Sequence, residues 1–310
     1  MSDPRGGVVL RDEGSQLIVD IDGAEVACVV RKSLRRAAGK FRKAVAVGDR
    51  VRVESSADGL AIVAVDPRRS YISRHDPGQR RKEQILVANL DAVLVVASAR
   101  QPDLAPGLID RFLVDAESRE LDVGIAINKI DLDPERTYGP VADVYRDLGY
   151  DVIEVSATGG AGVGSVREFL AAHTTTLLGH SGVGKSSLAN ALDASLDLRT
   201  ADVHAGSGQG AHTTTTVSLL RLPWADGGYL VDTPGIREFG LWRMEPSEVG
   251  HWFRDLARHL DACRFNDCVH ETEPGCAVKA AVETGDIATW RYESYRRILA
   301  SVRDDTPDAY

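Results

Sequence analysis

The stretch that most constrains this chain is a glycine-rich sequence in its second half. Residues 179–187 match the pattern G-x-x-x-x-G-K-[ST]. β-Branched and apolar residues precede it at 174–178, and Leu188 and Leu192 follow it at a helical spacing of four. A strand, a loop and a helix in this order direct backbone N–H groups and a helix N-terminus at one point, where a polyphosphate binds. The candidate phosphate-binding residues are Gly179, His180, Ser181, Gly182, Val183, Gly184, Lys185, Ser186 and Ser187. We expect Lys185 to reach the β- and γ-phosphates and to be catalytic, and the Ser186 hydroxyl to contact Mg²⁺.

Two short motifs indicate which base is bound. Asn128-Lys129-Ile130-Asp131 directly follows a predicted buried strand, at the sheet edge where ligands bind. The Asp131 carboxylate can accept from N1–H and the 2-amino group of guanine, whereas adenine would leave it unpaired. Asn128 can brace the neighbouring loops, and the stem of Lys129 can cover the ring. Ser156-Ala157 follows the next strand and can offer a backbone N–H to guanine O6, so these two motifs together with the phosphate loop predict a guanine nucleotide.

A third motif supplies the metal and γ-phosphate contacts. Asp232-Thr233-Pro234-Gly235 ends another strand and matches D-x-x-G, so Asp232 is expected to hold Mg²⁺ through water and the Gly235 N–H to sense the γ-phosphate. A run of threonines at 213–216 precedes that strand, and we select Thr214 as the residue that completes the magnesium shell. The alternative for this run is the start of a β-strand, which accounts for Thr216.

Hydrolysis requires an oriented water, and the position after D-x-x-G does not hold a residue that can orient it. Ile236 stands there and cannot hydrogen-bond a water. His212 lies in a glycine-rich loop predicted to be mobile over 198–216 and is the best-placed candidate for the catalytic role. The alternative is a surface histidine without a role.

The motifs stand in an unusual order along the chain. The base motifs come first, at Asn128 and Ser156, followed by the phosphate loop, the threonines and D-x-x-G. An ordinary GTPase begins with the phosphate loop, so the order predicts a circular permutation. As a consequence, the segment after Gly235, which responds to the γ-phosphate in GTPases, leads directly into the C-terminal region.

Hydrophobic patterning predicts a multidomain chain. Short strands at 8–10, 16–21, 25–31, 50–54 and 60–65 predict a small OB-fold barrel, followed by a polar linker at 67–84. Strands at 91–97, 123–127, 152–155, 174–178, 216–220 and 229–232, with helices at 108–118, 141–148 and 166–172, predict a parallel α/β sheet. Helices are expected at 247–258, 278–282 and 288–302. The expected domains are 1–70 (OB-fold, RNA-binding), 71–240 (permuted GTPase) and 241–310 (helical, zinc-binding).

The charge is unevenly distributed between these regions. The formal net charge of the whole chain is −9, yet residues 1–82 carry 17 Lys+Arg against 11 Asp+Glu. Seven basic residues without an acid fall between Arg31 and Lys43, in the loop expected after the third strand. A local positive field of this kind attracts a polyanion, so the barrel is a candidate RNA-binding domain; a solvated basic loop is the alternative.

The C-terminal region contains a metal-ligand spacing. Cys263, Cys268, His270 and Cys276 form a C-x4-C-x-H-x5-C pattern, which suits one structural, tetrahedral Zn²⁺. The alternative is a set of buried or free cysteines with a histidine nearby by chance. Cys28 stands apart on an apolar strand and is expected in the core.

Together these residues resemble one family, the small-ribosomal-subunit-dependent GTPases known as RsgA (YjeQ). The resemblance covers essentially the whole chain and rests on the base motif, the phosphate loop, residues 212–215, the D-x-x-G motif and the Cys/His spacing. It implies an OB domain, a circularly permuted GTPase domain and a zinc domain. It also implies GTP hydrolysis to GDP, stimulated by the small ribosomal subunit during late maturation of that subunit. The implied contacts are with 16S-type rRNA, through the barrel and the zinc domain.

Two other classes of function stay open on the residues alone. One is an RNA-binding protein whose nucleotide site only stabilises the fold, and the other is a P-loop kinase of a small metabolite. The base motif and D-x-x-G argue against the kinase. Without an N-terminal apolar segment or a bilayer-spanning stretch, the chain is expected to be a cytoplasmic monomer without a membrane partner.

Overall fold

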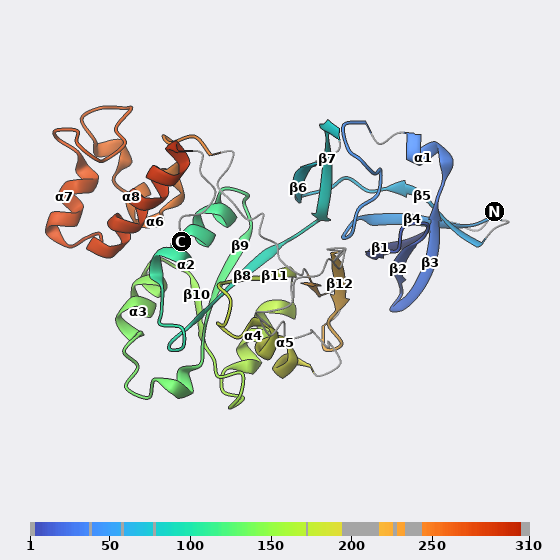
Figure 1. The fold of residues 1–310 in the computed structure, drawn as a ribbon, viewed down its shortest axis with the longest axis horizontal. Coiled ribbons are helices and arrows are strands. Elements are labelled where there is room, and N and C mark those ends of the chain that lie inside the picture. Colours follow the sequence, from blue (N-terminus) through green and yellow to red (C-terminus); the bar gives the residue numbers. More distant parts are fainter. Residues whose placement is uncertain are drawn as a thin grey trace, which may run out of the picture. The chain divides into compact units, whose positions relative to one another are not determined.

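The computed structural model describes residues 4–36, 39–56, 59–76, 79–171, 173–193, 217–225, 228–232 and 244–304 (Figure 1). The chain forms two compact units. The first comprises Met1–Ala92, Glu168–Thr176 and Leu198–Glu238, and the second comprises Val93–Arg167, Leu177–Asp197 and Phe239–Tyr310. Each unit therefore combines segments that are distant in sequence.

The first unit contains the five-stranded barrel that the sequence predicts. Its strands are β1 (Arg5–Asp12), β2 (Leu17–Ile21), β3 (Ala24–Val30), β4 (Arg50–Ser56) and β5 (Gly59–Val65). They pair in the order β1-β2-β3-β5-β4, and β4 pairs back to β1 to close the ring. Alternation along β4 buries Val51 and Val53 against Val19 and Ile62, and Cys28 lies in the same core as expected. The prediction of an OB-like barrel is confirmed.

The basic run is exposed, but it is not a plain loop. A short helix, α1 (Lys32–Arg36), follows β3 and buries none of its residues. All seven basic residues of the run are exposed, and among them Arg31 pairs with Glu54, Lys40 with Glu83 and Lys43 with Asp12. The positive face of the barrel is therefore available to solvent.

The prediction of a polar linker at 67–84 is wrong. A hairpin of β6 (Tyr71–Asp76) and β7 (Gln79–Ala88) occupies most of it, and Tyr71 pairs with Ala88. Ile72, Val87 and Ala88 are buried in it. The arginines hide the strand pattern because a two-stranded hairpin needs only a few apolar residues at its base.

Two polar residues that flank this hairpin, the half-buried Arg68 and the buried Asn89, attach it to the barrel. Arg68 donates from Nε to Asp49 Oδ1 and from Nη2 to Asp49 Oδ2, both at 2.7 Å, and Asp49 has no exposed surface. Asn89 adopts a left-handed conformation and donates to the Gly48 carbonyl at 2.9 Å. Because both contacts are desolvated, they fix the direction in which the chain leaves the barrel.

Two further strands extend from the barrel within the first unit. β12 (Ser218–Arg221) pairs antiparallel with β13 (Tyr229–Asp232), and β13 runs parallel to the beginning of β11 (Thr174–Leu178). On its other side β12 pairs with β1, where Ser218 lies opposite Arg11.

The second unit contains the predicted α/β alternation. The strands β8 (Ala92–Ser98), β9 (Asp122–Asn128) and β10 (Asp151–Glu154) lie in the order β10-β9-β8, and β9 and β10 are parallel. Along the chain, α2 (Pro106–Glu117) lies between β8 and β9, and α3 (Gly139–Asp147) lies between β9 and β10. The helices α4 (Val163–Ala171) and α5 (Lys185–Leu192) follow later. Every residue of β8 is buried, as expected for a strand covered on both faces.

The C-terminal region is helical, but its first predicted helix is broken. Residues 247–258 form a 3₁₀ turn, η3 (Val249–Trp252), and a single-turn helix, α6 (Arg254–Ala257). Phe253 between them is extended and fully buried, with its ring 5.7 Å from that of Tyr295, so packing of this ring prevails over helix continuity. A second turn, η4 (Leu260–Ala262), and the helices α7 (Ala277–Thr284) and α8 (Thr289–Arg303) follow.

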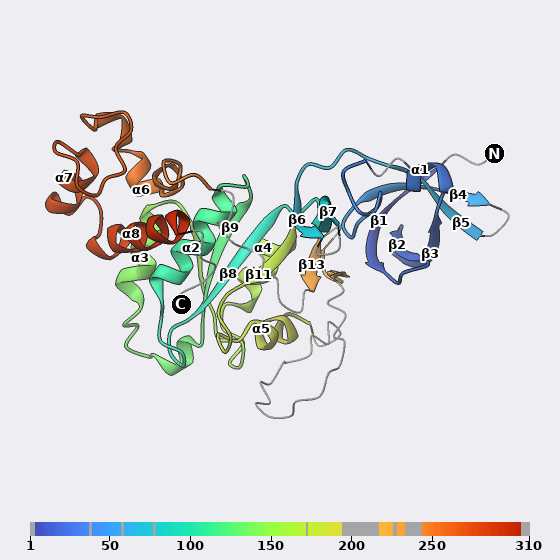
Figure 2. The same cartoon turned by 45° about the horizontal axis from the view of Figure 1, so that its top comes forward.

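A buried charge network holds this region against α2, and Figure 2 shows α8 beside α2. Arg291 of α8 is 1% exposed and donates to Asp255 of α6 at 2.9 and 2.8 Å, and also to Asp110 of α2. The hydroxyl of Tyr145 donates to the same Asp110 at 2.6 Å. The network joins three helices through one guanidinium group.

Replacing Arg291 should therefore be costly. Arg291→Leu leaves two buried carboxylates without their cation, and we expect the free energy of unfolding to fall by about 3–5 kcal/mol. Arg297→Leu on the same helix removes only an exposed ion pair with Glu293 and should change it by less than about 1 kcal/mol. Urea titrations followed by circular dichroism measure both, and equal unfolding midpoints for the two variants would contradict this role.

Candidate functional site

The phosphate loop lies between β11 and α5, as the sequence predicts, and its glycines are required by close approaches. A Cβ on Gly179 would lie 2.1 Å from the Val96 carbonyl oxygen of β8, and Gly179 has a φ of +150°. A Cβ on Gly184, with a φ of +94°, would lie 2.4 Å from Nδ2 of Asn128. Larger residues would push the loop away from the strand and from the base motif.

The side chain of Lys185 folds back onto the backbone of the phosphate loop. Lys185 is the first residue of α5, and its Nζ donates to the carbonyl oxygens of Gly179 at 2.7 Å and His180 at 3.0 Å. Burial lowers the pKa of Lys185. Its ammonium group and the unpaired N–H groups of the first turn of α5 present positive charge at one place, which suits a phosphate.

Asn128 joins the base motif to the phosphate loop. It is the last residue of β9 and is 1% exposed. Its Nδ2 donates to the Val183 carbonyl at 2.9 Å, and its Oδ1 accepts from the backbone N–H of Ala157 at 3.1 Å. One side chain therefore connects three segments that the sequence analysis assigns to the same ligand, and the predicted bracing role of Asn128 matches this geometry.

Lys129 and Asp131 occupy the same edge of the sheet. Lys129 is left-handed, and its Nζ donates to the Gly182 carbonyl at 2.6 Å and to the Gln101 carbonyl. Asp131 lies in the 3₁₀ turn η1 (Ile130–Leu132) with an exposed carboxylate that accepts from the buried Ser156 hydroxyl at 2.5 Å. Ser156 also accepts from the Gly159 N–H at 2.9 Å, which fixes its rotamer. The hydroxyl thus orients an acid that stays open to a ligand.

Gln101 is a contact that the sequence reasoning missed. It follows β8 at the carboxyl edge of the sheet, and Ser98 Oγ donates to the Pro102 carbonyl at 2.6 Å within the same turn. The contact with Lys129 is made by the Gln101 backbone carbonyl, so the type of side chain at this position could not predict it. Its position after a parallel strand is the cue that could have found it.

Four further predicted residues belong to the first unit or lie outside the described residues. Asp232 is the half-buried last residue of β13 in the first unit, and burial raises the pKa of its carboxyl. His212, Thr214 and Gly235 lie outside the described residues. The catalytic and magnesium roles of these four residues stay predictions.

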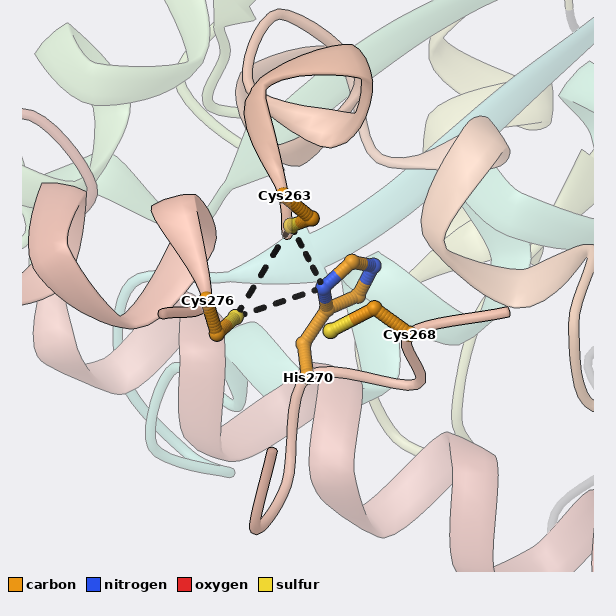
Figure 3. Close-up of side chains that lie close together, drawn as sticks. All are labelled: Cys263, Cys268, His270 and Cys276. Carbon is orange, nitrogen blue, oxygen red and sulfur yellow. Dashed lines mark hydrogen bonds between the residues drawn. The ribbon is translucent and has the colours of Figure 1, made fainter. Parts of the chain in front are cut away.

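A second cluster lies in the C-terminal region, where Cys263, Cys268, His270 and Cys276 converge (Figure 3). Their ligand atoms all lie within 4.8 Å of one another. His270 Nδ1 is 3.5 Å from Cys263 Sγ and 3.4 Å from Cys276 Sγ, and the two sulfurs are 4.0 Å apart. Zinc bonds of about 2.0–2.3 Å place tetrahedral ligand atoms roughly 3.5–3.8 Å apart, so the set fits Zn²⁺.

Backbone contacts shape the loop that carries these ligands. Glu273 accepts from the N–H groups of Val269, Glu271 and Thr272 at 2.8–3.0 Å. The Tyr292 hydroxyl donates to the His270 carbonyl at 2.6 Å, and Cys276 Sγ accepts from the Lys279 N–H at the start of α7. Such contacts orient ligands around a closed metal site.

The geometry of Asp131 predicts base specificity. Asp131→Asn should lower the affinity for GDP at least about tenfold, because an amide cannot accept from both N1–H and the 2-amino group. Affinity for a xanthine nucleotide, which has a carbonyl in place of the amine, should rise. Competition against a fluorescent GDP measures both, with the exposed Asp147→Asn on α3 as control. An unchanged preference for guanine would exclude Asp131 from base recognition.

Metal analysis tests the second cluster. The purified protein should contain about one equivalent of zinc, because three thiolates and an imidazole complete a tetrahedral shell. Cys276→Ser should lose most of it, whereas Cys28→Ser, in the barrel core, should keep it. Elemental analysis after gel filtration gives the ratio, and full zinc retention in Cys276→Ser would show that this cysteine is not a ligand.

Known proteins resemble this chain over nearly its whole length. The RsgA GTPase family matches residues 65–242. A small ribosomal subunit biogenesis GTPase RsgA of Chlorobaculum tepidum is 41% identical, over 98% of this chain and 100% of that protein. The protein of the same name from Gemmatimonas aurantiaca is 44% identical over 94% and 95%.

Solved structures agree with these sequence matches. YjeQ from Thermotoga maritima superimposes with a TM-score of 0.79 at 33% identity, covering 97% of this chain and 99% of that one. YloQ, described as a circularly permuted GTPase, gives a TM-score of 0.76 at 28% identity, covering 98% and 97%. With its base motifs ahead of the phosphate loop, this chain belongs to the RsgA family of circularly permuted GTPases.

Proposed function

We propose that this GTPase binds the small ribosomal subunit, is stimulated by it, and assists its late maturation. The observation that carries the proposal is the Asn128 contact that unites the guanine motif and the phosphate loop in a chain that also exposes a basic barrel face. The names of the relatives, small ribosomal subunit biogenesis GTPases, support the choice of partner.

In this proposal each group of residues has one task. Asn128, Lys129, Asp131, Ser156 and Ala157 hold guanine, and residues 179–187 hold the phosphates with Lys185 as the main cation. Mg²⁺, held by Ser186, Thr214 and Asp232, would neutralise charge that develops on the phosphates. The Gly235 N–H senses the γ-phosphate. Zinc in the Cys/His cluster is structural and takes no part in hydrolysis.

Contact with the subunit is assigned to two regions. The seven exposed basic residues after β3 would meet rRNA phosphates, in a region whose local charge opposes the net negative charge of the chain. The zinc region would supply the second contact. None of the helices in the described part combines the length and apolar character needed to cross a bilayer. We assign the protein to the cytoplasm, as a monomer.

Stimulation by the subunit follows from the residue after D-x-x-G. Ile236 cannot orient a water, so the intrinsic rate should be low, and we assign the missing role to His212 once the subunit is bound. The segment after Gly235 would carry the nucleotide state to the zinc region, because the permutation joins them directly in the chain.

Phosphate release measured with and without purified small subunits tests the proposal. We expect stimulation of at least about tenfold by small subunits and little by large subunits. His212→Ala should keep nucleotide affinity and intrinsic rate and lose most of the stimulation, because the attacking water is then left without the group that orients it.

Two results would count against these assignments. Equal rates with and without subunits would refute subunit-stimulated turnover. Full stimulation of the His212→Ala variant would remove only the histidine from the mechanism.

A further inference from the structure

The barrel contacts the β12–β13 hairpin at two separate points, and one of them adjoins Asp232. At that point Arg11 of β1 lies opposite Ser218 of β12, which in turn lies opposite Asp232 of β13. Figure 1 shows β12 beside β1. The carboxylate proposed for magnesium is therefore two strands away from the barrel in one continuous ladder.

The second point is a buried hydrogen bond at the other end of β13. The Tyr229 hydroxyl donates to Oδ2 of Asp20 in β2 at 2.9 Å, and both residues are 7% exposed. The other oxygen of Asp20 accepts from the Gly23 N–H in the β2–β3 turn at 2.8 Å. Burial and the neighbouring Asp20 raise the pKa of Tyr229, so the hydroxyl keeps its proton and acts as the donor.

Arg221 reinforces this contact from β12. It is the strand partner of Tyr229, and its Nε lies 3.6 Å from Oδ2 of Asp20. Its Nη1 also donates to the Gly23 carbonyl at 3.5 Å, and a Cβ on Gly23 would lie 2.7 Å from that atom. The turn between β2 and β3 is thus held by side chains from the hairpin.

Because β13 is attached to the barrel at both of its ends, we expect the strand to move together with the barrel. Tyr229 and Asp232 bound a strand of four residues, roughly 10 Å long at about 3.3 Å per residue. Moving β13 relative to β2 would leave the buried Asp20 carboxylate without its tyrosine donor, which is costly in a desolvated site. A force on the barrel is therefore transmitted to the strand that ends in Asp232.

We propose that Asp20 and Tyr229 are positioning residues that couple RNA binding at the barrel to the placement of the Asp232 carboxylate. The inference rests on the proposed function, because it takes Asp232 as a magnesium-binding residue and RNA as the ligand of the basic face. Coupling of this kind is reciprocal: RNA at the barrel strengthens magnesium binding, and bound Mg²⁺·GTP strengthens RNA binding.

The magnesium requirement of nucleotide binding measures this coupling. A fluorescent non-hydrolysable GTP analogue is titrated with Mg²⁺, with and without small ribosomal subunits. For the wild type, subunits should lower the Mg²⁺ midpoint by about fivefold or more. Tyr229→Phe keeps the ring and removes the donor, so its midpoint without subunits should rise by a similar factor and the shift caused by subunits should disappear.

Two further variants separate coupling from general damage. Asp20→Asn weakens the same contact from the barrel side and should change the midpoint in the same direction. Tyr138→Phe removes a comparable hydroxyl, which donates to Glu154 at 2.8 Å in the second unit, and should behave like the wild type. Melting temperatures confirm that each variant is folded.

The outcomes distinguish this inference from the proposed function. If subunits do not bind the wild type, the proposed function fails, while the comparison of Tyr229→Phe with wild type in the absence of subunits still tests the positioning of Asp232. If folded Tyr229→Phe and Asp20→Asn keep the wild-type midpoint and its shift, the inference is overturned.

Discussion

The candidate nucleotide site depends on one buried amide. Asn128 is the only described side chain that bonds both to the phosphate loop, at the Val183 carbonyl, and to the segment after β10, at the Ala157 N–H. It requires a glycine beside it, because a Cβ on Gly184 would lie 2.4 Å from its Nδ2. A buried amide left without either partner would lose a desolvated hydrogen bond, so the base and phosphate segments are held in register by their own contacts. The site is therefore organised within the second unit.

Circular permutation changes what is attached to this site. In the first unit Arg68, Asp49 and Asn89 attach the β6–β7 hairpin to the barrel. Strand β12 extends the same ladder from β1 to Asp232. In the second unit Arg291 fastens the helical region to α2. The RNA-binding candidate is thus bonded to the strand that ends in Asp232, and the metal-binding candidate is bonded to a helix of the second unit.

The sequence predicts the repeated and periodic parts of this structure. Barrel strands, the α/β alternation, the phosphate loop and the Cys/His cluster each follow from local spacing, and all are present. Features that are set by tertiary contacts could not be predicted from the sequence. The β6–β7 hairpin is masked by arginines, and Phe253 interrupts a helix because its ring is buried against Tyr295. The Gln101 carbonyl and the Asp20–Tyr229 bond join residues distant in sequence, so no local pattern could reveal them. For His212, Thr214 and Gly235 the sequence is the only guide, since they lie outside the described residues.

In the proposed function, the guanine nucleotide held around Asn128 decides whether this chain is bound to the small ribosomal subunit. Co-sedimentation with purified small subunits, in GDP, in a non-hydrolysable GTP analogue and without nucleotide, tests this most directly. We predict retention with the analogue and binding at least about tenfold weaker with GDP, a coupling of about 1.4 kcal/mol or more. Equal co-sedimentation in all three conditions would exclude control of subunit binding by the nucleotide, because the nucleotide would then only stabilise the fold of an RNA-binding protein.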